Sequence, residues 1–130
     1  MKRTLQIIGA SLLFTFIGVV LIIHLWIGHA VKDNINTAKK LYPGTAEDAL
    51  IAYLMDENNS FRNRTHLAIW TLGQIESEKA KPVLMGLYKN DPEGKTCYGK
   101  HDSVLCQYEI YKALNAKKVN WWPLHPGLNK

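Results

Sequence analysis

The sequence contains none of the short motifs that mark the common catalytic sites. Its 130 residues include no GxxxxGK[ST] phosphate loop, no HExxH zinc-protease helix, no GxSxG nucleophile turn and no CxxCH haem-attachment motif. The acidic pairs Glu47-Asp48 and Asp56-Glu57 fall at expected helix ends, where carboxylates face the helix dipole or solvent. We therefore predict no enzymatic activity, no catalytic residue, no metal, no cofactor and no small-molecule substrate.

The sequence also lacks a cluster of basic residues. Beyond residue 31 there are 14 Lys and Arg (16 less Lys2 and Arg3) against 11 Asp and Glu, a net charge of +3. The basic side chains in this part are scattered, and the longest runs are pairs. A nucleic-acid-binding protein more often shows one basic face, so no nucleic-acid partner is predicted.

Charge is missing altogether from residues 5–31, LQIIGASLLFTFIGVVLIIHLWIGHAV. A stretch of 27 uncharged residues exceeds the roughly 20 that cross a bilayer as a helix. Because a backbone in lipid must satisfy its own polar groups, the stretch is expected to be helical, with Trp26 at the interface. We predict a single membrane span over residues 1–31, with the lipid bilayer as one partner.

The span resembles a signal peptide in layout, with a basic start and a small-x-small sequence at Gly28-His29-Ala30. Its apolar run is too long for an ordinary signal peptide, which favours an uncleaved signal anchor. The short basic N-terminus and the two cysteines favour a cytoplasmic N-terminus and a C-terminal domain on the periplasmic side.

Two kinds of residue within the span are candidates for function. Small residues allow close helix contact, so an integral membrane protein subunit is expected to pack there; the candidates are Gly9, Ser11, Thr15 and Gly18. His24 could ligate a haem shared with a partner, whereas the simpler interpretation is a half-hydrated interfacial histidine. His29 is about 140° further around the helix, so the two histidines cannot hold one group together.

A linker is expected at residues 32–44; its polar first part, residues 32–37, can continue the helix for a turn or two before the break at Pro43-Gly44. After this linker the periodicity is helical. Thr45 is a predicted N-cap, with Asp48 three residues later. Four helices are expected, near residues 46–54, 62–76, 80–88 and 103–116. The inward positions of the first recur 34 residues later in the third: Ala46, Ala49, Leu50, Tyr53 and Leu54 become Ala80, Val83, Leu84, Leu87 and Tyr88. This period, with two helices per unit, is typical of a helical solenoid.

One run of residues resembles a known family. AIWTLGQI at residues 68–75, followed by AKPVL at residues 80–84, is similar to the HEAT repeat in its PBS-lyase HEAT-like form. A second unit at residues 111–116 is a weaker match, because Asn115 stands where the family usually has glycine. In the first unit, the position where the family usually has arginine is occupied by Thr65, with Arg64 next to it. The resemblance covers residues 45–116 and implies an all-α, protein-binding α–α scaffold without catalytic residues.

The two cysteines are the remaining chemical signal. We predict a disulfide between Cys97 and Cys106, which would tie a loop to the start of the fourth helix and stabilise the fold by roughly 2.5–3 kcal/mol. Two free thiols are the alternative. Zinc held by Cys97, His101, Asp102 and Cys106 is a third interpretation; its spacing matches no known pattern, and His66 would have to come from another helix.

The aromatic tail at residues 117–130 is either a cap on the last helix or a peptide that docks on a partner, through Trp121, Trp122, Pro123 and Leu124. The sequence thus predicts a membrane-anchored helical-repeat accessory or scaffold subunit that stabilises partner proteins of a larger membrane complex. Two alternatives stay open: a subunit of a respiratory or photosynthetic redox complex that binds a cofactor through His24, and an assembly chaperone.

Overall fold

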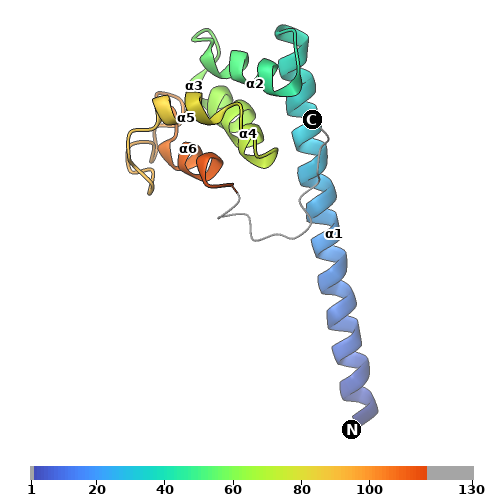
Figure 1. Cartoon of the computed structure of the whole chain (residues 1–130). Coiled ribbons are helices and arrows are strands. Elements are labelled where there is room, and N and C mark those ends of the chain that lie inside the picture. The colour runs from blue at the N-terminus through green and yellow to red at the C-terminus, as the bar shows by residue number, and fades with distance from the viewer. Residues whose placement is uncertain (1, 117–130) are drawn as a thin grey trace. The chain divides into compact units, whose positions relative to one another are not determined.

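The computed structural model describes residues 2–116, with side chains from Gln6 onward, and every regular element in this range is a helix (Figure 1). The predicted all-α class, with a long apolar helix at the N-terminus, is therefore confirmed. The described chain divides into two compact units between Ala30 and Val31. The candidate contacts of the tail, Trp121, Trp122, Pro123 and Leu124, lie outside the described residues.

The first unit is the N-terminal part of helix α1 (Lys2–Leu41). Its apolar side chains project outward along the helix; Phe14 is 76% exposed and Trp26 is 75% exposed. Among the described residues, α1 is the one helix long and apolar enough to cross a membrane, and a signal sequence would satisfy the same criteria. The helix can therefore form a single span.

The second unit includes the end of α1, which the sequence analysis assigned to a linker. Residues 31–41 are helical instead, with Val31 and Ala38 buried and the Asn34 side chain donating a hydrogen bond to Thr71 Oγ1 at 2.9 Å. The linker is thus confined to the turn after Leu41. The sequence analysis allowed the helix to continue only to residue 37; it extends to Leu41, with Ile35 and Ala38 in the core.

Helix α2 (Ala46–Met55) begins at the predicted cap. Thr45 Oγ1 accepts a hydrogen bond from the backbone N–H of Asp48 at 3.2 Å and donates one to its carboxylate at 2.7 Å. This bond pairs one of the first-turn N–H groups that a helix leaves without a partner. Four of the five predicted inward residues are buried: Ala49, Leu50, Tyr53 and Leu54.

The predicted second helix consists of three consecutive helical stretches: α3 (Phe61–Asn63), η1 (Arg64–Ile69) and α4 (Trp70–Gln74). Ser60 caps its start by accepting the backbone N–H of Asn63 at 3.2 Å. It ends before Glu76, whose φ of 49° is left-handed. The π-helical geometry of η1 is not predicted by the periodicity. In η1 Arg64 is buried, and its Nε donates to the carbonyl of Leu54 at 2.6 Å, which closes the end of α2.

Two shorter helices complete the second unit: α5 (Lys81–Leu87) and α6 (Gln107–Leu114). The prediction that the last helix begins at Ser103 is wrong by about one turn. The backbone N–H of Ser103 instead donates to the carbonyl of Lys100 in a turn, at 2.9 Å. Cys106 is the N-cap and is extended, with φ −73° and ψ 114°. Its disulfide to Cys97 holds it outside the helix.

These helices pack as two pairs within the second unit: α2 lies against η1, and α5 lies against α6 (Figure 1). Contact between α4 and α6 joins the pairs. The approach is closest at Gly73, where a Cβ atom would stand 3.0 Å from Cα of Ala113. The fully buried large aliphatic side chains of this core come from every helix pair: Leu50, Leu54, Ile69, Leu72, Leu84 and Ile110.

Candidate functional site

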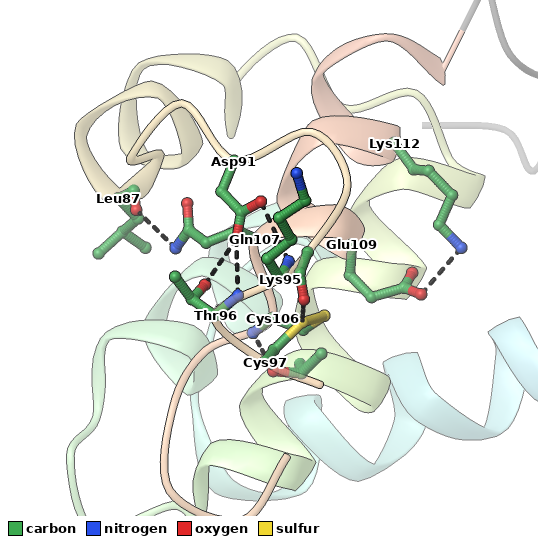
Figure 2. Close-up of a disulfide and its surroundings, with 11 residues drawn as sticks. Leu87, Asp91, Lys95, Thr96, Cys97, Cys106, Gln107, Glu109 and Lys112 are labelled. Carbon is green, nitrogen blue, oxygen red and sulfur yellow. Dashed lines mark hydrogen bonds and ion pairs between the residues drawn. A yellow bond between two sulfur atoms is a disulfide. The ribbon is translucent and has the colours of Figure 1, made fainter. Parts of the chain in front are cut away.

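The loop between α5 and α6 is the most heavily cross-linked part of the second unit. The Asp91 carboxylate accepts three hydrogen bonds, from the backbone N–H groups of Lys95 (3.1 Å) and Thr96 (2.9 Å) and from the Thr96 hydroxyl (2.8 Å; Figure 2). The backbone N–H of Thr96 contributes most to lowering the pKa of Asp91. An ionised Asp91 therefore fixes the turn that leads to Cys97.

Gln107 ties the two ends of this loop together. Its buried side-chain amide accepts the backbone N–H of Lys89 at 2.6 Å and donates to the carbonyl of Leu87 at 3.3 Å (Figure 2). The last turn of α5 is thereby joined to the first turn of α6. Sequence analysis missed this role, because nothing in the local sequence distinguishes Gln107 from a solvated glutamine.

Cys97 and Cys106 form a disulfide, as predicted, with Cα atoms 5.0 Å apart (Figure 2). Both residues are 3% exposed. The backbone N–H of Cys106 also donates to Thr65 Oγ1 at 3.3 Å, which attaches the loop to helix η1. The bond therefore closes the loop against the core rather than on the surface.

The structure places His101 beside the disulfide. The sulfur atoms of Cys97 and Cys106 and a ring nitrogen of His101 all lie within 4.8 Å of one another. The Nδ1 atom of His101 is buried and has no hydrogen-bond partner. The ring of His66, from η1, lies 5.7 Å from the His101 ring, centroid to centroid. Asp102 points elsewhere, since it pairs with Arg62 at 3.3 Å and its side chain is 77% exposed.

A polar network at the end of α2 was also missed by sequence analysis. The Tyr42 hydroxyl donates to Asp56 Oδ2 at 2.5 Å and accepts from the side chain of Asn59 at 3.0 Å. Asn59 donates as well to the carbonyl of Tyr53 at 3.0 Å. The Tyr42 hydrogen bond is the main cause of the lowered pKa of Asp56. These groups hold α1 against α2, and their separation in sequence concealed them.

The small residues of the apolar helix do not share one face. At about 100° per residue, Ser11, Thr15 and Gly18 fall within about 60° of one another, whereas Gly9 lies on the opposite side. The Thr15 hydroxyl donates to the carbonyl of Ser11 at 2.9 Å, so it is paired within the helix. A Cβ atom at Gly9 or Gly18 would meet nothing within 4 Å. The face of Ser11, Thr15 and Gly18 is therefore open to a neighbouring helix.

A hollow opens at the ends of α5 and α6. Its lining combines apolar and charged side chains: Glu76, Glu78, Lys81, Ala113, Leu114, Asn115 and Ala116. A second, smaller hollow lies between η1–α4 and α6, around Trp70, Gly73 and Lys112.

Comparisons with protein-family models, with curated proteins and with solved structures gave no match.

Proposed function

We propose that the protein is a membrane-anchored helical-repeat scaffold that binds and stabilises the subunits of a larger membrane complex. The observation that carries the proposal is the exposed apolar surface of α1. Side chains such as Phe14 and Trp26 leave about three quarters of their surface exposed, an apolar surface that lipid or another membrane helix would cover. An uncleaved anchor with the C-terminal domain on the periplasmic side is the arrangement we favour.

The HEAT-like character of the second unit supports a binding role. The order of the helices, α2 before η1–α4 and α5 before α6, is compatible with two α–α repeats, with a longer loop inside the second pair. Leu50 of the first pair and Leu84 of the second, 34 residues apart, are both fully buried. Two pairs are fewer than a solenoid usually needs. Residues 31–41 cover one end of the stack, because Ala38 packs into the core.

The partner helix is expected to contact the face of Ser11, Thr15 and Gly18, where small residues allow backbones to approach closely. A matched pair of variants follows from the helix geometry. Gly18→Leu places a large side chain in this face, whereas Gly9→Leu places the same side chain on the opposite side. A Cβ atom at either position meets no atom of a neighbouring segment within 4 Å, so both variants are expected to fold alike.

The test is purification of the tagged full chain from its native membranes in mild detergent. The proposal predicts that the parent chain is recovered with a second polypeptide in stoichiometric amount. The Gly9→Leu variant should retain this partner, whereas the Gly18→Leu variant should recover at least about tenfold less of it, which corresponds to a loss of about 1.4 kcal/mol in binding free energy. Recovery of every variant as a single polypeptide would refute the scaffold function. Equal recovery of the partner with both variants would refute the assigned face.

A further inference from the structure

We propose that Cys97, His101 and Cys106 bind one zinc ion whenever the two cysteines are thiols rather than a disulfide. The three residues come from one loop, yet their donor atoms converge to within 4.8 Å of one another. Two thiolates and an imidazole are donors that zinc prefers in structural sites. This proposal is independent of the scaffold function, because it concerns the loop between α5 and α6 alone.

The distances suit a tetrahedral ion after a small movement. With Zn–S near 2.3 Å and Zn–N near 2.0–2.1 Å, neighbouring donors in a tetrahedral site stand about 3.5–3.8 Å apart. When the disulfide opens, the two sulfur atoms separate toward that spacing. The ring nitrogen of His101 already lies within 4.8 Å of both. The loop therefore needs to move a donor by only about 1 Å.

The Nδ1 atom of His101 is the independent observation that points to a ligand. It is buried and has no hydrogen-bond partner among the described residues. A buried polar atom without a partner is costly, and in folded proteins such an atom commonly marks an ion or a water molecule. If Nδ1 is the ring nitrogen that ligates a zinc ion held by the two sulfur atoms, the ion gives this buried atom its partner.

A fourth donor lies close by on a different helix. The ring of His66 lies 5.7 Å from the ring of His101, centroid to centroid. Thr65, next to His66, accepts the backbone N–H of Cys106, which keeps η1 beside the cysteine loop. His66 belongs to η1, whose π-helical geometry is a feature often found at functional sites.

Zinc and the disulfide are alternative cross-links of the same loop. Zinc binding displaces one proton from each thiol, so Zn²⁺ and two thiols give a neutral dithiolate complex and two protons. Thiol–disulfide exchange with an external disulfide then joins the two sulfur atoms. The external disulfide takes up the two electrons and two protons to become two thiols, and Zn²⁺ leaves. The loop would thus be closed in both redox states.

The experiment uses the full chain in detergent with a tag free of histidine. The chain is reduced with a phosphine, and zinc affinity is measured by competition with a chromophoric chelator. One Zn²⁺ per chain is expected, with release of protons. Cobalt substitution should give thiolate-to-cobalt charge-transfer absorption. Oxidation to the disulfide should abolish both signals.

Two variants distinguish a specific zinc site from adventitious zinc binding. His101→Ala should weaken zinc binding by about tenfold or more, since even outer partners of metal sites contribute that much. Because this variant keeps both cysteines, its oxidised form reports whether the fold is intact, by circular dichroism. Asp102→Asn is the matched control in the same loop and should bind as the parent does, because Asp102 pairs with Arg62 instead.

Two results would overturn the proposal. One is zinc binding by the reduced parent chain no tighter than that of the Cys97→Ser/Cys106→Ser variant. The other is unchanged affinity in His101→Ala with an intact oxidised fold, which would leave the two cysteines as an adventitious zinc-binding pair.

Discussion

Two glycines occupy equivalent places in their helices, yet replacing each by alanine should change the free energy of unfolding in opposite directions. Gly73 is the last residue but one of α4, and Gly86 is the last residue but one of α5. Replacing glycine by alanine in a helix stabilises it by about 0.5–1 kcal/mol, because the unfolded chain loses freedom. At Gly86, where a Cβ atom meets nothing within 4 Å, this gain should appear unopposed.

At Gly73 the same gain is opposed by a clash. The added Cβ atom would stand 3.0 Å from Cα and 3.1 Å from Cβ of Ala113. The nearest atom is backbone rather than the end of a flexible side chain, so α6 itself must shift. Overpacking of this kind costs about 1–3 kcal/mol. Gly73→Ala should therefore lower the free energy of unfolding by about 1 kcal/mol, while Gly86→Ala raises it by about 0.5 kcal/mol.

Urea unfolding of the full chain in detergent, followed by circular dichroism, measures both values. The span stays helical in the micelle and contributes a constant baseline. In a thermal experiment, each kcal/mol corresponds to about 4–8 °C for a unit of this size. Equal stabilisation by the two substitutions would refute the close approach of α4 to α6, and with it the packing of the two helix pairs.

Three further predictions concern the second unit. Cys97→Ser/Cys106→Ser should lower the free energy of unfolding by roughly 2.5–3 kcal/mol in oxidising buffer, since ten residues are no longer closed into a loop; reducing the parent chain with zinc chelated should give the same loss. The free energy of unfolding should fall as the pH drops below about 4, because Asp48, Asp56 and Asp91 have lowered pKa values in the folded chain and the unfolded chain therefore binds protons first. Asp91→Asn should make this pH dependence less steep, and an unchanged pH dependence would contradict the role of the Asp91 turn. A C-terminal alkaline phosphatase fusion should be active and a green fluorescent protein fusion dark, as expected for a domain outside the cytoplasm; the reverse pattern would refute the orientation.

Local periodicity predicted most of the fold. The stripe of Ala49, Leu50 and Leu54 in α2, and the cap at Thr45, depend on residues within one or two turns of each other, and both are present. The continuation of α1 was anticipated only to residue 37, because the charged residues beyond it obscured the helical spacing of Val31, Ile35 and Ala38. A search for apolar stripes beneath charged stretches would have found it.

The features missed are those that depend on contacts distant in sequence. Cys106 is held outside α6 by bonds to Cys97 and to Thr65, 41 residues earlier. His66 meets His101 only because η1 packs beside the loop. The π-helical turn at η1 has no signature in the apolar pattern. The sequence offered these residues as possible zinc ligands, but the convergence of the Cys97, His101 and Cys106 donor atoms to within 4.8 Å depends on how the loop folds.

The scaffold function is tested most directly by the native mass of the particle that contains this chain. The chain has a mass of 14.8 kDa. Native mass spectrometry after extraction from its own membranes in mild detergent should give a larger particle, in which the chain and at least one other integral membrane polypeptide have a fixed stoichiometry. A particle of 14.8 kDa, with bound lipid or detergent alone, would contradict the account.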